Sequence, residues 1–232
     1  MYLLSSQQKK AGRLFFFLSL IFIFFFPIQT VAAKSGQPIR PKNFQQYGFV
    51  VKGFSAEQER IIGATLAAFD RELGGHGRLA RIMRTYNSGK NWTITYVPDW
   101  TGADSSMKLS PTVFSIEKAV SSNYSSYGAG DEIMHAQIVI GHEISHLLLR
   151  AVRDITGVKW SENYEQQVTR NWVSMLDKKA PEEEAVTEFS LKILNCGYFF
   201  SINADAQESD PKFIAEIDEW AEEFLSTLQK LD

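Results

Sequence analysis

The most constraining feature of this chain is the stretch His142 to His146, which reads HEISH and lies within an apolar segment from Ala136 to Leu149. The segment predicts a buried helix, because it is apolar nearly all the way round. Histidines four residues apart on a helix differ by about 40° in direction, so both imidazoles can bind one ion. Glu143 is adjacent to His142, which places its carboxylate beside the ion, where a general base is needed.

The same residues could instead be ordinary polar side chains of a helix. A buried setting disfavours that alternative, because an unpaired buried polar group costs about 1 to 3 kcal/mol. A single metal ion would compensate all three groups. We therefore predict one Zn²⁺ per chain, with His142 and His146 as ligands and Glu143 as the catalytic residue.

The first 33 residues have the three parts of a secretory signal peptide. Basic residues come before an uncharged apolar run from Leu14 to Phe26, and small residues end at Ala33, after which we expect cleavage. An uncleaved membrane anchor is the alternative, but a spanning helix needs about 20 apolar residues and this run is shorter. The sequence thus predicts an exported protein, periplasmic or extracellular, without a stable membrane anchor after cleavage.

The charge of the chain disfavours a nucleic-acid partner. The full sequence has 24 basic and 27 acidic residues, for a formal net charge of −3. Loss of the basic residues in the signal region would make the mature chain more acidic. Since no basic cluster interleaved with aromatic residues is present, we expect no nucleic-acid partner.

The first half of the mature chain predicts a small sheet with one covering helix. Residues 34–54 are expected to form a flexible segment that ends in a short strand between Tyr47 and Phe54. Ser55 is a predicted N-cap for an amphipathic helix that ends at Gly74 and Gly75. Alternation predicts strands over 79–86 and 92–97, which would pair as a hairpin. A polar loop over 98–106 precedes a short edge strand at 107–109, and the segment from Ser110 to Ile116 fits either a helix or a strand.

The second half predicts mainly helices. Ser161 is expected to cap a polar helix that runs to about Asp177. Pro181 suits the first turn of a helix rich in glutamate, and Pro211 opens a last amphipathic helix. Together with the HEISH helix, these segments favour an α+β fold with a helical C-terminal half.

A catalytic zinc site usually has three protein ligands. The other histidines are badly placed, since His135 lies about 10 Å back along the same helix. A carboxylate from the cluster at 182–188 is therefore the natural third ligand. Glu182 lies nearer than Glu184 to the centre of the apolar face formed by Ala185, Val186, Phe189 and Ile193, while Glu183 and Glu188 are further alternatives.

HEISH followed by a helical glutamate resembles the gluzincin metallopeptidases, and Glu184 to Phe189 is similar to their glutamate segment. The resemblance implies a zincin-like fold, Glu184 as the third ligand and Glu188 as a partner that orients His142 or His146. Glu182 followed by Ala185 is similar to the pattern of the membrane-associated gluzincins, which implies Glu182 as ligand instead. The resemblance to the gluzincins covers about 60 residues and assigns no particular family.

These observations predict a zincin-like metallopeptidase domain over residues 55–232. Zinc would polarise the scissile carbonyl of a peptide or protein substrate, and Glu143 would take a proton from the attacking water and pass it to the leaving amine. Tyr198, Tyr164 and His135 are candidates for contact with the oxyanion or the substrate. The alternatives are a non-catalytic zincin-like binding module and a secreted toxin or effector peptidase of narrow specificity.

Overall fold

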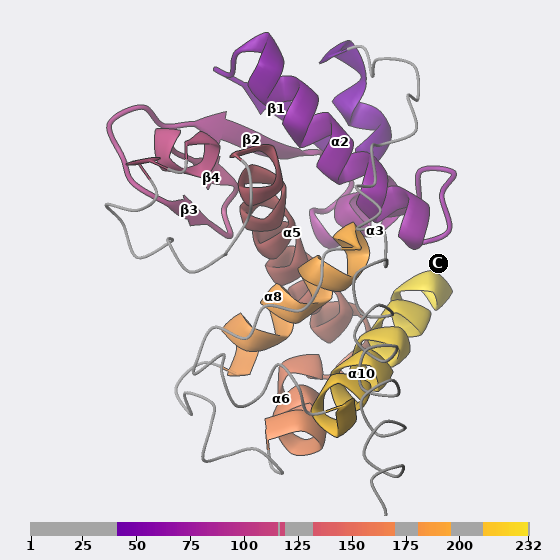
Figure 1. Ribbon diagram of the computed structural model, residues 1–232. Helices are drawn as coiled ribbons and strands as arrows, with labels where there is room; N and C mark the ends of the chain where they lie inside the picture. The colour runs from indigo at the N-terminus through magenta and orange to yellow at the C-terminus, as the bar shows by residue number, and fades with distance from the viewer. Residues whose placement is uncertain (1–40, 116, 119–131, 170–180, 196–210, 232) are drawn as a thin grey trace, which may run out of the picture. The chain divides into compact units, whose positions relative to one another are not determined.

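The computed structural model describes residues 41–115, 117–118, 132–169, 181–195 and 211–231 (Figure 1). The predicted signal peptide lies outside these residues. The described chain is mixed α+β, mostly helical, with one small mixed sheet. No helix in this part of the chain is long and apolar enough to cross a membrane.

The sheet has four strands in the order β1-β2-β4-β3. Strands β1 (Phe49–Lys52) and β2 (Trp92–Tyr96) pair in parallel, as do β2 and β4 (Lys108–Leu109), whereas β3 (Ala103–Asp104) pairs antiparallel with β4. The strands expected near 47–54, 92–97 and 107–109 are confirmed. However, β4 lies between β2 and β3 and is not an edge strand, and the segment expected to be a polar loop contains β3.

The N-terminal part of the described chain is more ordered than expected. Residues Pro41–Tyr47 form the 3-10 helix η1, in which Phe44 and Tyr47 are buried within the hydrophobic core. Burial of these two rings ties the segment to the folded body instead of leaving it a flexible tether. Helix α2 (Ala56–Glu72) begins as predicted at Ser55, whose hydroxyl accepts a hydrogen bond from the backbone of Gln58 in a capping box.

The strand predicted over 79–86 is wrong, because this segment is helix α3 (Arg78–Tyr86). Its buried side chains follow helical spacing: Leu79, Ala80, Ile82 and Met83. The carboxylate of Asp70 accepts hydrogen bonds from the backbone N–H groups of Gly77 and Leu79, which satisfies the start of the helix. The predicted hairpin is therefore also wrong. Strand β2 pairs directly with β1, and α2 and α3 lie between these two strands only in the sequence.

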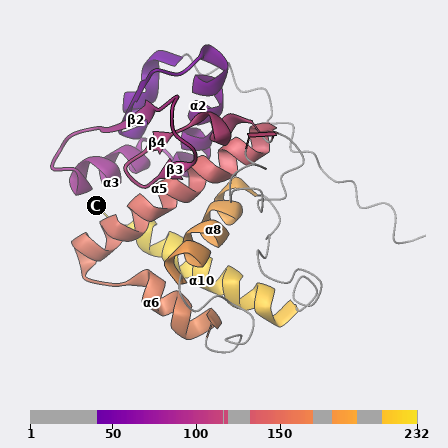
Figure 2. The ribbon, with the colours of Figure 1, turned by 90° about the vertical axis from the view of Figure 1, so that its left-hand side faces the viewer.

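Helix α5 (Glu132–Thr156) carries the HEISH stretch and is buried over most of its length. Helices α2 and α3 contact it, and so does helix α8 (Pro181–Leu194), which crosses it (Figures 1 and 2). Helix α10 (Pro211–Lys230) packs against α8 and the short helix α6 (Trp160–Tyr164). The segment Pro111–Phe114 forms the 3-10 helix η2, which resolves the choice left open there.

The helix predicted to start after Ser161 begins two residues earlier, because Lys159 and not Ser161 is the N-cap of α6. It continues as a π-helical turn, η4 (Glu165–Thr169). Its buried residues recur every four positions, at Trp160, Tyr164 and Val168, so one side of this segment belongs to the core. The expected end near Asp177 lies outside the described residues.

Close packing of α5 on α8 depends on Gly141. A Cβ at this position would lie 2.4 Å from Ser190 Oγ, 3.2 Å from Phe69 Cε2 and 3.3 Å from Leu194 Cδ1. We expect Gly141→Ala to lower the free energy of unfolding, because overpacking costs about 1 to 3 kcal/mol and outweighs the ~1 kcal/mol by which alanine favours a helix. Chemical denaturation measures the change.

The matched control for this substitution is the double variant Gly141→Ala with Ser190→Ala. Removing the serine hydroxyl relieves the closest contact, so the double variant should recover most of the lost stability. Equal stability of Gly141→Ala and the wild type would contradict this account of the helix contact.

Candidate metal centre

Helix α5 places His142 and His146 one turn apart on the side that faces α8. Both side chains are buried, at 5% exposure each, and their rings meet edge to face with centroids 4.8 Å apart. The two Nε2 atoms lie 3.2 Å from one another. The expected convergence of the two imidazoles on one point is thus present.

Glu183 supplies the carboxylate at this point. Its Oε2 lies 3.1 Å from His142 Nε2, and its Oε1 lies 3.3 Å from His146 Nε2. The potential ligand atoms of the three residues all lie within 4.8 Å of one another. The cluster of His142, His146 and Glu183 could therefore hold a metal ion.

The other nitrogen of each imidazole has a partner on α8. His142 Nδ1 lies 3.0 Å from Thr187 Oγ1, and His146 Nδ1 lies 2.9 Å from Glu182 Oε1. The Thr187 hydroxyl donates its own proton to the backbone oxygen of Glu183, at 2.8 Å, so it accepts from His142. A carboxylate accepts as well, and both histidines therefore carry a proton on Nδ1.

With a proton on each Nδ1, the Nε2 atoms of the two histidines face each other and the Glu183 carboxylate. Three acceptors so close repel one another unless a proton or a cation lies among them. The donor set of two imidazole nitrogens and one carboxylate oxygen is also one that Zn²⁺ prefers. The residues present thus fit a metal ion of this kind.

The pKa shifts of Glu183 and His142 agree with a ligand role, which needs a carboxylate and a neutral imidazole. Hydrogen bonds from His142 and His146 hold the pKa of Glu183 well below its usual range. Burial, aided by the neighbouring His146, lowers the pKa of His142. Burial also disfavours a charged His146, but the carboxylates of Glu183 and Glu182 outweigh it and raise the pKa of that imidazole.

Glu143 lies on α5 beside this cluster and is 4% exposed. Burial raises the pKa of its carboxyl to about 7, and the charges of Glu183 and Asp104 add to the effect. Asp104, whose charge raises this pKa, belongs to the edge strand β3, which contacts α5. A bound cation would stabilise the carboxylate and lower its pKa again.

The cluster in the structure does not contain the glutamate that was predicted to be the third ligand. Glu184 is not part of the cluster, where Glu183 takes its place. Glu182, the other main candidate, lies against Nδ1 of His146, which is the position of an orienting partner.

Glu188 does not orient either histidine, since Glu182 and Thr187 occupy the two Nδ1 atoms. It is 1% exposed, and among the described residues its Oε2 has no hydrogen-bond partner. Burial, aided by the charge of Glu184, raises the pKa of this carboxyl well above its usual range.

The two described candidates for substrate contact, Tyr164 and His135, have their contacts elsewhere. Tyr164 is buried and packs edge to face on Trp220, with ring centroids 4.9 Å apart. His135 is buried two turns before His142 and bonds to the backbone of Thr112, while burial lowers its pKa. Tyr198 lies outside the described residues.

Thr187 had no predicted role, and Glu183 was only one of the alternatives for the third ligand. The positions of Thr187 and Glu183 follow from the spacing on α8, where Glu183, Thr187 and Ser190 recur at helical intervals. Ser190 Oγ donates a hydrogen bond to the backbone oxygen of Ile138 on α5. This polar stripe is the side of α8 that meets the histidines. In the sequence, the small polar stripe beside the apolar stripe of α8 was the pattern that could have identified Glu183 and Thr187.

A scan against models of known protein families finds no match for this chain, and searches of curated proteins and of solved structures find none either. Any assignment of chemistry therefore rests on the residues and geometry described above.

Proposed function

We propose that this protein is a zinc-dependent peptide hydrolase with a zincin-like architecture, exported by its N-terminal segment. One observation carries the proposal: the Nε2 atoms of His142 and His146 converge with the Glu183 carboxylate while hydrogen bonds fix both Nδ1 atoms. Such outer partners are typical of metal-binding histidines, because they set the tautomer and the ring orientation.

Each polar residue of the site has a role in this proposal. His142, His146 and Glu183 would hold the ion, which when bound supplies a Lewis acid that polarises the scissile carbonyl and acidifies water. Glu143 accepts a proton from the attacking water and delivers it to the leaving amine. Thr187 and Glu182 keep the imidazoles oriented.

The identity of the metal follows from the donor atoms. Two imidazole nitrogens and a single carboxylate favour Zn²⁺, whereas Ca²⁺ and Mg²⁺ prefer sites made of oxygen ligands. Two buried histidines and, in the described part of the chain, one clustered carboxylate thus argue for zinc over the alkaline earth ions.

A catalytic role is favoured over a silent binding module by Glu143. Neither the Nδ1 partners nor the three potential ligands include this carboxyl, so a structural metal site has no use for it. Keeping a carboxyl 4% exposed costs free energy, as its raised pKa reflects. A general base next to the ion accounts for that cost.

The proposal predicts that the purified protein contains about one zinc per chain. Zinc content by atomic emission and release of peptides from denatured casein are the two measurements. A chelator should abolish the hydrolysis and added Zn²⁺ should restore it. A protein that binds no zinc at neutral pH would contradict the proposal, whereas zinc binding without any hydrolysis would favour the binding module.

A further inference from the structure

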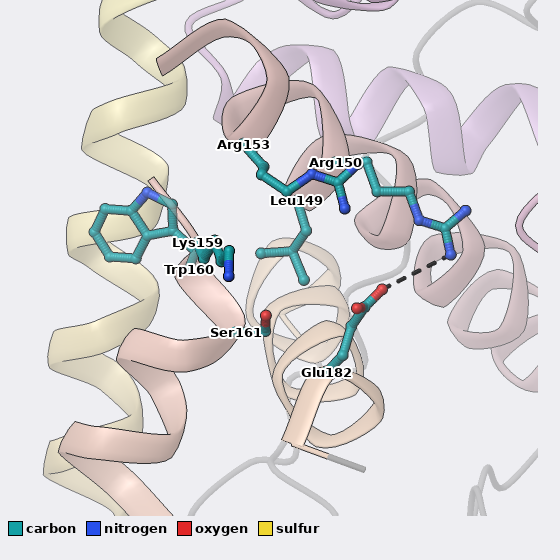
Figure 3. Close-up of a pocket in the computed structure, with 7 residues that line it drawn as sticks. All are labelled: Leu149, Arg150, Arg153, Lys159, Trp160, Ser161 and Glu182. Atoms are coloured by element: carbon teal, nitrogen blue, oxygen red, sulfur yellow. Dashed lines mark ion pairs between the residues drawn. The ribbon is translucent and has the colours of Figure 1, made fainter. Parts of the chain in front are cut away.

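A pocket of about 220 Å³ lies next to the metal cluster (Figure 3). It is formed between the end of α5, the start of α6 and the first turn of α8. Its lining residues are Leu149, Arg150, Arg153, Lys159, Trp160, Ser161 and Glu182. Because Glu182 also bonds to His146, one side chain belongs to both the pocket and the cluster.

The pocket is cationic in a chain that is acidic overall. Arg150, Arg153 and Lys159 face one carboxylate, that of Glu182, whereas the full chain has a net charge of −3. Figure 3 shows the three cationic side chains and Glu182 around a common space. Three cations around one cavity favour an anionic ligand.

Two of these cations can reach a ligand at little cost. Arg153 Nε bonds to Asp154 at 2.8 Å and Lys159 Nζ to Glu162 at 2.7 Å, in pairs whose side chains are about half exposed. Exposed pairs of this kind contribute between 0 and about 1 kcal/mol. The guanidinium of Arg153 also keeps its terminal nitrogens as donors when Nε is bound to Asp154.

Arg150 has a different role, because it connects the sheet to α8. Its Nη1 donates to Ser105 Oγ at 2.7 Å, and its Nη2 lies 3.8 Å from Glu182 Oε1. Changing Arg150 would therefore disturb the partner of His146 as well as the pocket. Arg153 and Lys159 are the cleaner positions for a test.

We propose that this pocket binds a carboxylate of the peptide substrate, an inference that rests on the proposed function. The carboxylate is either the free C-terminus or an acidic side chain near the scissile bond. The volume suits one amino-acid residue, since sites for drug-sized ligands are about 300 to 1,000 Å³. Leu149 and Trp160 give the pocket apolar walls for the rest of that residue.

The test compares three peptides with zinc-loaded protein that carries Glu143→Gln, so that the peptides are not cleaved. Acetyl-Ala-Ala-Ala has a free C-terminus, acetyl-Ala-Glu-Ala-amide has only an acidic side chain, and acetyl-Ala-Ala-Ala-amide has neither. We expect one of the first two to bind at least about tenfold more tightly than the third by calorimetry, because hydrogen bonds to charged groups are worth that much. Whichever binds more tightly identifies the source of the carboxylate.

Adding Arg153→Gln and Lys159→Gln should remove this preference and leave the zinc content unchanged. Arg60→Gln is the matched control, since Arg60 is also exposed and paired with a nearby carboxylate, Glu57, but lies on α2. Equal affinity for the three peptides, including no detectable binding of any, overturns the pocket proposal. So does a preference that survives the double substitution.

Failure of the proposed function has a different signature. If the unsubstituted protein lacks zinc or does not hydrolyse peptides, the peptidase proposal fails, whatever the affinities. If it is zinc-loaded and active but shows no preference for a carboxylate, only the pocket proposal fails.

Discussion

Replacing Glu143 with glutamine is expected to lower kcat by about 10² to 10⁴-fold, the range that a positioned general base contributes. Glutamine has nearly the same size and cannot accept the proton of the attacking water. The ligands are untouched, so zinc should remain at about one per chain. Initial rates on a quenched fluorescent peptide, together with the zinc content of the same preparation, measure both effects.

Glu132→Gln is the matched control for this substitution. Glu132 is on the same helix, at its exposed first turn, and far from the cluster. Its replacement should leave the rate within the experimental scatter. If Glu143→Gln retained full activity, Glu143 would not be the base, and if it lost zinc, the carboxyl would have to serve the metal directly.

Local patterns in the sequence were enough to predict several elements. Ser55 followed by Gln58 is a capping box, and helix α2 begins there. The apolar run around HEISH became the buried helix α5, and Pro181 and Pro211 open α8 and α10. In each case a cap or a long periodic run lies within the segment itself, so no distant contact is needed to define it.

Helix α3 could not be predicted in this way, because nine residues with arginines at every third position fit two periods. Alternation suggested a strand, whereas burial follows Leu79, Ile82 and Met83. The deciding contact comes from Asp70, which satisfies the first N–H groups of α3. That contact depends on the turn between the two helices, which sequence alone does not specify.

The sequence did not show which glutamate of α8 would meet the histidines, because this helix has two buried sides. Its apolar side packs on α10, where the ring centroids of Phe189 and Phe224 lie 4.7 Å apart. Helical spacing placed Glu182 nearer that side than Glu184, yet the Glu182 carboxylate reaches Nδ1 of His146 on α5. The histidines are met by the polar stripe that contains Thr187, which packs closely on α5 because Gly141 has no side chain.

The choice between Glu183 and Glu184 is expected to be decided by zinc affinity. Glu183→Gln should raise the zinc dissociation constant by more than about 100-fold, because even outer partners of metal ligands contribute 10 to 100-fold. Glu184→Gln should leave it almost unchanged, since Glu184 is not in the cluster. Competition with a chromophoric chelator measures the affinities.

Thr187→Val provides an intermediate case that tests the orientation of His142. Valine keeps the shape of threonine but removes the acceptor of the Nδ1 proton, so zinc affinity should fall about 10 to 100-fold. The loss of zinc affinity should be largest for Glu183, smaller for Thr187 and smallest for Glu184. This order distinguishes a metal ligand, a partner that orients a ligand, and a residue without a role at the site. A loss of zinc in Glu184→Gln greater than in Glu183→Gln would show instead that the carboxylate implied by the gluzincin resemblance binds the metal, and that α8 turns when the ion is present.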